Sequence, residues 1–160
     1  MTADEIIKKL NLVHLDIEGG FFRETYRSSA KVVSETPRSA GTCIYYMLTG
    51  KTISDWHKVA SDEIWLYHAG SPAVQLLLFP DGRWEERIIG PDILSGEVPQ
   101  SLIPAGTWQA AVLTNRNEDD WGLFGALVVP GFEYSDFTLG KRDELSVKYP
   151  DAAAKIKSLW

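Results

Sequence analysis

Short runs rich in aromatic and β-branched residues, separated by turn signals, occupy most of the chain between its two ends. The turn signals include Gly19-Gly20, Pro80-Asp81-Gly82 and Pro130-Gly131. Runs of this kind, bounded by glycine and proline, are typical of β-strands. The predicted strands cover residues 21–28, 42–48, 63–68, 74–79, 84–89, 109–113 and 121–129, with a last strand around 134–139. Because no helices interleave them, they predict an all-β domain, a sandwich or barrel of the jelly-roll kind.

Helix signals are confined to the two ends of the chain. Thr2 and Glu5 match a capping box, and an apolar stripe follows them, so a short N-terminal helix is expected at about residues 3–10. Apolar residues recur at helical spacing within residues 150–159, which predicts a C-terminal helical tail.

One of the predicted strands is apolar on both of its faces. Along residues 42–48, one face would carry Ile44, Tyr46 and Leu48. The opposite face would carry Cys43, Tyr45 and Met47. Neither face can be left in water without cost, so something must cover the outside of this sheet. The terminal helices are one possible cover, and a second subunit is the other; we expect a homodimer.

Size and charge narrow the class of protein. The chain has 160 residues, 44% of them hydrophobic, which suffices for one core, so a single domain is expected over residues 1–160, with its barrel at about 21–139. The 16 basic residues face 22 acidic ones, and the net charge of −6 argues against nucleic acid as a partner. The N-terminus has charged residues and no apolar run, so no membrane partner and a cytoplasmic location are expected.

A first group of polar residues points to chemistry. Asp55 and His57 are two positions apart, so on a strand they would share a face. Residues 58–62 can form a turn that brings Glu63 back beside His57. Because aromatic residues flank this group, Trp65 among them, a partly buried contact between imidazole and carboxylate is expected, which is typical of functional sites.

Two further features could bind a ligand. Pro104 and Gly106 form a tight entry to a strand on which Gln109 could project inward as a neutral donor and acceptor. Arg23 follows Gly19-Gly20 and offers a planar fork suited to a carboxylate or phosphate. Strand parity alone leaves open whether Arg23 faces the interior or forms an ion pair on the surface.

Several motifs resemble the small cupin family of unknown function. They are EGGFFRETYRS (residues 18–28), WH (56–57), DEIW (62–65), GPD (90–92) and PAGTWQ (104–109). The resemblance extends from about residue 6 to residue 139 and implies a cupin-type jelly-roll β-barrel with one ligand pocket inside it.

The same resemblance bears on metal binding. Metal-binding cupins use two histidines spaced by one residue, a glutamate and a third histidine. Here Asp55 stands at the first histidine position, His57 at the second, Glu63 at the glutamate with one extra residue of spacing, and Gln109 at the last histidine. Because too few imidazoles remain for a transition metal, no metal and no cofactor are predicted.

These residues support more than one function. Metal-free cupins include sugar-nucleotide epimerases, in which a histidine paired with a carboxylate removes a proton next to a carbonyl. By analogy His57 is the expected base, oriented by Asp55 or Glu63. We expect Arg23, Trp65, Tyr67 and Gln109 to bind a polar or anionic metabolite such as a keto-sugar nucleotide, with Tyr67 or Tyr134 returning a proton. A metabolite-binding module without turnover is the alternative, and a metal-dependent oxygenase ranks third.

Overall fold

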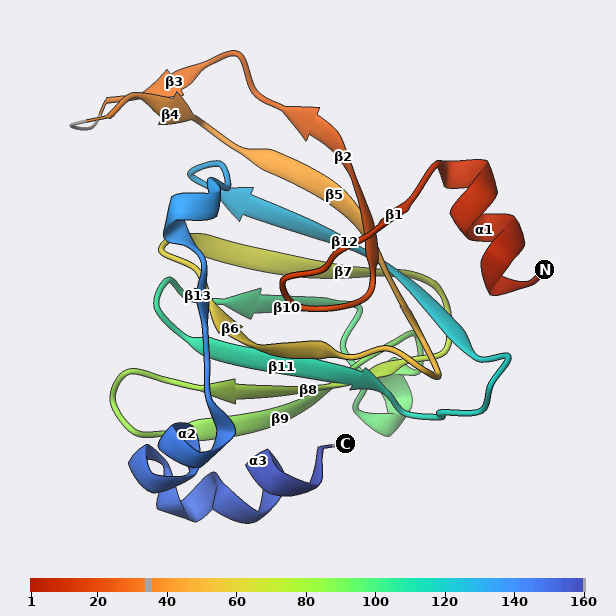
Figure 1. Cartoon of the computed structure of the whole chain (residues 1–160), viewed down its shortest axis with the longest axis vertical. Coiled ribbons are helices and arrows are strands. Elements are labelled where there is room, and N and C mark those ends of the chain that lie inside the picture. The colour runs from red at the N-terminus through yellow and green to blue at the C-terminus, as the bar shows by residue number, and fades with distance from the viewer. Residues whose placement is uncertain (34–35, 160) are drawn as a thin grey trace.

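Two antiparallel sheets pack face to face in the computed structural model, which describes residues 1–33 and 36–159 (Figure 1). The six-stranded sheet has the spatial order β1 (Val13–His14), β2 (Phe21–Arg27), β5 (Thr42–Thr49), β12 (Trp121–Val129), β7 (Asp62–Gly70) and β10 (Gln100–Ile103). The five-stranded sheet has the order β13 (Thr138–Leu139), β6 (Ser54–Lys58), β11 (Trp108–Leu113), β8 (Ala73–Leu78) and β9 (Trp84–Ile89). A separate hairpin joins β3 (Lys31–Val32) and β4 (Arg38–Ser39). The expected all-β cupin-type architecture is confirmed.

The main core lies between the two sheets. Tyr46, Trp65 and Phe124 project into it from the six-stranded sheet, and Leu77 and Leu113 project from the five-stranded sheet. All five side chains are almost fully buried. Alternation along each strand produces this arrangement, since every second residue points to the same face.

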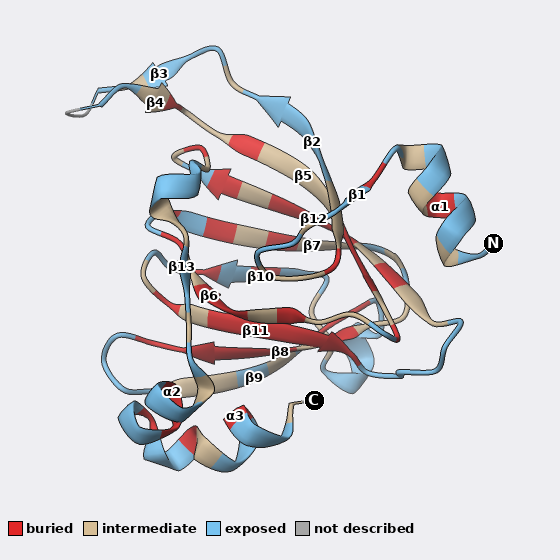
Figure 2. Ribbon diagram, viewed as in Figure 1, coloured by how far each residue is buried: buried red, intermediate tan, exposed pale blue. Residues whose placement is uncertain are grey.

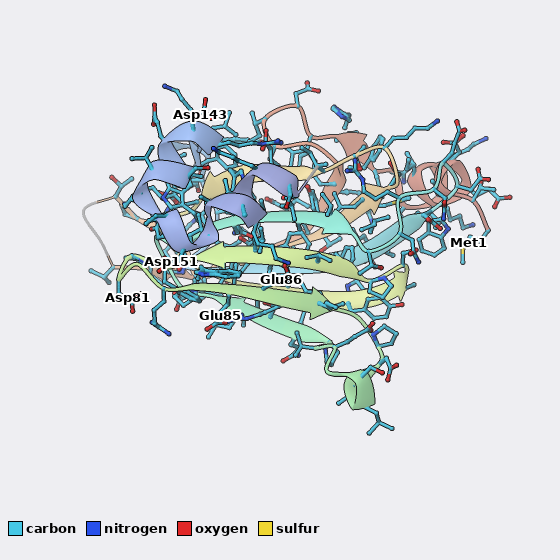
Figure 3. The ribbon with its side chains drawn as sticks, turned by 90° about the horizontal axis from the view of Figure 1, so that it is seen from below. Met1, Asp81, Glu85, Glu86, Asp143 and Asp151 are labelled. Carbon is cyan, nitrogen blue, oxygen red and sulfur yellow. The ribbon has the colours of Figure 1, made fainter. Side chains whose placement is uncertain are left out.

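Helices cover the outer face of each sheet to a different extent (Figures 1 and 2). At the N-terminus α1 (Ala3–Leu10) begins with the predicted capping box and packs with Met47. At the C-terminus lie α2 (Arg142–Lys148), the 3₁₀ turn η3 (Pro150–Ala152) and α3 (Ala153–Ser158). These helices cover Trp56 and its neighbours on the five-stranded sheet. Lys155 forms an ion pair at 2.6 Å with Glu86 of β9, and Glu86 is labelled in Figure 3. The N-terminal helix is confirmed, and the predicted C-terminal tail consists of η3 and α3.

Some elements differ from the pattern-based prediction. The strand expected around 134–139 is the 3₁₀ turn η2 (Tyr134–Asp136) followed by the two residues of β13. Local hydrogen bonds close that turn, from the amide of Asp136 to the carbonyl of Glu133 and from Phe137 to Tyr134. The strand β10, the 3₁₀ turn η1 (Ile93–Ser95) and the helix α2 were not predicted. They are short, so the pattern along the sequence has few repeats in which to appear.

The outer face of the six-stranded sheet is only partly covered. Met47 is fully buried because Ile6 and Leu12 pack on it, whereas Cys43 and Tyr45 on the same strand stay half-buried. The described residues therefore cover this face at one end only. Among the described residues, no helix has the length and apolar character needed to cross a membrane.

Candidate functional site

A cavity of about 110 Å³ opens inside the barrel, lined by described residues of both sheets and of the segment after β12. Most of its wall is apolar, including Phe22, Ile44 and Trp65. The acidic and basic residues among its described lining residues are Glu18, Glu24, Arg27, His57, Glu63 and Glu133. A mostly apolar cavity with a few converging polar groups is the usual form of a small-molecule site.

His57 is held in a single orientation on β6. Its side chain is 3% exposed, and its Nδ1 lies 2.7 Å from the backbone oxygen of Asp55. A carbonyl oxygen can only accept a hydrogen bond, so Nδ1 carries a proton in this contact. The ring also stacks on Phe137, with centroids 5.2 Å apart and planes inclined by 13°. Nε2 is therefore the nitrogen left to exchange a proton in the cavity.

The carboxylate that faces this nitrogen belongs to Glu18. Its Oε2 lies 3.4 Å from Nε2 of His57, and its Oε1 accepts a hydrogen bond of 3.2 Å from Ser54. Glu18 lies in the loop between β1 and β2, far from His57 in the sequence. Sequence reasoning missed this partner, although Glu18 opens the EGG motif, and that was the one available signal.

The expected pairing of the Asp55 side chain with His57 is wrong. The register between β6 and β11 shifts, because Ser54 pairs with Ala111 and His57 pairs with Gln109. Three steps along β6 thus oppose two steps along β11, so Ser54 and His57 face the same side and simple alternation fails. The carboxylate of Asp55 is 40% exposed and accepts a hydrogen bond of 2.8 Å from the amide of Trp56. Only the backbone of Asp55 contacts the imidazole.

Glu63 lines the same cavity as His57, as the predicted turn required. The side chain is buried, and each of its oxygens accepts a hydrogen bond: 3.1 Å from Nε1 of Trp65 and 2.6 Å from Nε2 of Gln109. Burial raises the pKa of Glu63, although His57 and the two donors act in the opposite direction. The inward position expected for Gln109 is confirmed, but it contacts Glu63 and is not among the described cavity-lining residues.

The structure does not bring Arg23 and Tyr67, both expected to bind the ligand, to the cavity. Neither is among the described residues that line the cavity. Phe22 and Glu24 face the cavity, so alternation turns Arg23 outward, where its guanidinium lies 5.6 Å from the ring centre of Tyr45. The hydroxyl of Tyr67 donates to the carbonyl of Gly70 at 2.7 Å, which closes the end of its own strand.

A different tyrosine lies close to Glu18. Tyr46 lines the cavity and is buried, and its hydroxyl donates to the carbonyl of Gly19 at 2.9 Å. Burial, followed by the nearby charge of Glu18, raises the pKa of Tyr46 well above its usual value. Its hydroxyl therefore stays neutral. Tyr134, the other tyrosine considered from the sequence, also lines the cavity.

The arginine at the cavity is Arg27, which sequence reasoning missed. A register shift between Glu24 and Tyr26 places Glu24 and Arg27 on the same face of β2. Nε and Nη2 of Arg27 each donate to Glu24 at 2.9 Å, and Nη1 donates to Glu133 at 3.1 Å. Nη2 also donates to the backbone oxygen of Phe132 at 3.1 Å. This cluster joins β2 to the segment after β12.

The two packed antiparallel sheets and the internal cavity define a cupin-type barrel. The fold alone is shared with oxalate decarboxylase of Bacillus subtilis, at a TM-score of 0.56 and 14% identity over 94% of this chain and 38% of that one.

More specifically, the chain belongs to the family described as Cupin superfamily (DUF985), which matches residues 4–140. It is 35% identical over 158 residues to an uncharacterized protein of Saccharomyces cerevisiae, covering 89% of this chain and 78% of that one. Two solved structures are similar over 99% of this chain. They are a hypothetical protein of Leishmania major (TM-score 0.87, 32% identity, 98% of that chain) and a protein of Shewanella oneidensis (TM-score 0.88, 33% identity, 97% of that chain).

The donor set of the cavity does not fit the metal centre that many cupins carry. Among the described residues, no group of three or more His, Cys, Asp and Glu side chains is arranged to hold a metal ion. Both oxygens of Glu63 already accept hydrogen bonds, and an amide stands at the position of the last histidine. These residues therefore do not supply the ligand set of that metal centre.

Proposed function

We propose that this protein binds a small carbonyl compound in the barrel cavity and moves a proton at the carbon next to the carbonyl, as isomerases and epimerases do. The observation that carries the proposal is the pairing of His57 and Glu18. Nδ1 of His57 is committed to a backbone carbonyl, and Nε2 points at a carboxylate 3.4 Å away in the cavity. An imidazole fixed in this way has the geometry of a general base.

The positions of the protons explain how His57 and Glu18 would act together. The proton on Nδ1 leaves the lone pair of Nε2 free to accept a proton, and the nearby carboxylate of Glu18 favours the positive charge that results. When substrate enters, Nε2 takes the proton from carbon, and the imidazolium that forms is stabilised by the carboxylate of Glu18. In an isomerisation the same nitrogen then returns the proton to a neighbouring atom, whereas in an epimerisation a second group, for which Tyr134 is the candidate, donates a proton to the other face. Glu18 is a positioning residue in this scheme.

The cavity volume limits the substrate. A cavity needs roughly 10–15 Å³ of volume to hold one water molecule, which is one non-hydrogen atom. At that volume for each atom, the cavity of about 110 Å³ holds about eight non-hydrogen atoms. A whole sugar nucleotide exceeds that space. The proposed substrate is therefore a small metabolite, or the reacting end of a larger one.

Deuterium exchange tests the proposal directly. The protein is incubated in deuterated water with a panel of small ketones, aldehydes and hydroxyketones, and label at the carbon next to the carbonyl is followed by NMR. His57→Gln should slow exchange by about 10²- to 10⁴-fold, the usual contribution of a general base. The control is His14→Gln, because His14 is exposed and pairs with Asp16 away from the described lining of the cavity.

The alternative is a binding module without turnover, which the mostly apolar wall supports equally. It would be adopted if a compound bound in the cavity without exchanging or being converted, and if His57→Gln changed its affinity alone. Retention of exchange in His57→Gln would contradict the assignment of His57 as base.

A homodimer is proposed on separate grounds. Leu66 and Leu127 point outward from the six-stranded sheet and are only half-buried, and Leu102 on its edge strand is exposed. Covering them with a second copy would remove this apolar surface from water. Light scattering over a dilution series should give twice the mass of the 17.9 kDa chain, and Leu66→Lys should reduce it. A monomer mass at every concentration would contradict the proposal.

A further inference from the structure

The charges around the cavity are unbalanced. The described residues that line it include four glutamates, at positions 18, 24, 63 and 133, but Arg27 and His57 are the only lining residues that can be positive. At the mouth, Glu24 and Glu133 share the single guanidinium of Arg27. Two carboxylates against one guanidinium leave a net negative charge there, whatever the protonation of the inner residues.

Arg27 has little capacity left for an anionic ligand. Three of its nitrogens donate to Glu24 and Glu133, and Nη2 also donates to a backbone carbonyl. A ligand carboxylate or phosphate would have to displace these partners and would meet their negative charge. Arg23, the other arginine of this strand, lies on the outer face. Arg27 therefore links β2 to the segment after β12 at the mouth of the cavity, and it does not serve as a binding site for an anion.

The two residues next to Glu133 in the sequence are aromatic and also line the cavity. Phe132 and Tyr134 line the cavity with ring centroids 5.3 Å apart in an edge-to-face arrangement. An ammonium group is attracted both by a carboxylate and by the face of an aromatic ring, so both kinds of side chain present here favour it. The rings also suit the apolar body of a small ligand.

From these features we infer that the cavity selects a small ligand that carries an ammonium group and rejects carboxylates and phosphates. The inference rests on the proposed function for the location of the site and adds the substrate class, a small amine-bearing carbonyl compound. Its ammonium would lie at the mouth beside Glu133, and its carbonyl would lie further in, beside His57.

Three probes of similar shape, all small enough for the cavity, test the charge preference without any turnover: 3-methylbutylamine, 3-methylbutan-1-ol and 3-methylbutanoate. Each is titrated into the wild-type protein, and amide shifts of residues around the cavity are followed by NMR. The amine should bind about tenfold more tightly than the carboxylate, with the alcohol between them. Glu133→Gln should lower the affinity for the amine several-fold and leave that for the alcohol unchanged. The control, Glu118→Gln, removes the same charge at an exposed residue paired with Lys51 and should change neither affinity.

Binding of 3-methylbutanoate as tightly as the amine would overturn the inference, as would a loss of amine affinity in Glu118→Gln equal to that in Glu133→Gln. The outcome is separable from that of the proposed function. If exchange at carbon depends on His57 but no amine preference exists, only the substrate class is wrong. If the amine preference holds and no carbonyl compound exchanges, the cavity is a cation-selective binding site without turnover.

Discussion

Two groups of buried polar side chains lie inside the same barrel, and they differ in what surrounds their charges. In the first, His57, Glu18 and Glu63 face the cavity. In the second, Ser101 donates to Gln75 at 2.6 Å, and Arg87 donates to Ser101 at 3.0 Å. No described residue of the second group lines the cavity.

In the second group, the charge of Arg87 is paired with a carboxylate at the surface. Arg87 bonds to Glu85 at 2.6 Å, and Glu85 is 41% exposed at the edge strand β9 (Figure 3). In the first group, two carboxylates stay inside the barrel next to one imidazole, and burial raises the pKa of Glu63. Buried polarity alone thus does not mark a functional site. Titratable groups that face each other across a cavity are the better candidates for such a site.

The largest expected effect follows from removing the donor that holds Glu63. Gln109→Leu leaves a buried carboxyl oxygen without its 2.6 Å hydrogen bond, so the free energy of unfolding at neutral pH should fall by about 2–3 kcal/mol. Urea denaturation measures it. Gln100→Leu on the edge strand β10 is the control, because Gln100 is exposed and its replacement should change stability by less than about 0.5 kcal/mol. Equal losses in both variants would show that Glu63 does not depend on its partner.

A smaller loss is expected in the second group. Arg87→Met removes the hydrogen bonds to Ser101, Glu85 and the carbonyl of Leu102 but keeps most of the apolar stem. Because the guanidinium is partly exposed, the expected cost is about 1–2 kcal/mol by urea denaturation. The deuterium-exchange rate should be unchanged. A loss of exchange in this variant would mean that the two groups are coupled.

The pH dependence of stability should separate the groups further. The folded pKa of Glu63 is raised, so its favourable contribution is complete below the unfolded pKa and is lost as the pH rises through the folded pKa. Unfolding free energies are compared for wild type and Glu63→Gln from pH 4 upward. The wild type should lose stability relative to Glu63→Gln as the pH rises, whereas wild type and Arg87→Met should run parallel. An opposite slope would mean that Glu63 is ionised and stabilising in the folded protein.

The smallest effect is expected at Asp55. Asp55→Asn should leave deuterium exchange within about twofold of wild type, since only the backbone oxygen of Asp55 contacts His57. Glu18→Gln should lower the same rate about tenfold or more, because the carboxylate that faces Nε2 is lost. Rates measured side by side under one set of conditions decide between the two carboxylates. A larger loss in Asp55→Asn would restore the pairing expected from alternation.

The sequence by itself determined the all-β class, most strand positions and the N-terminal helix. The signals for these elements are alternating apolar positions, glycine and proline turns, and a capping box. Each signal depends on only a few neighbouring residues, so the sequence shows it directly. It also identified His57 and Glu63 as neighbours, because one short turn joins their strands. The motifs it shares with small cupins agree with the family match.

Only the tertiary structure decided which side chains meet in the cavity. Two register shifts, one between Glu24 and Tyr26 and one opposite Gln109, change which side chains share a face. They turn Asp55 away from His57 and bring Arg27 to the mouth. A β-bulge arises from the pairing of two strands, so the sequence of one strand alone does not predict it. Glu18 reaches His57 through a loop from a distant part of the chain, and such a contact is set by packing between elements and has no local signal.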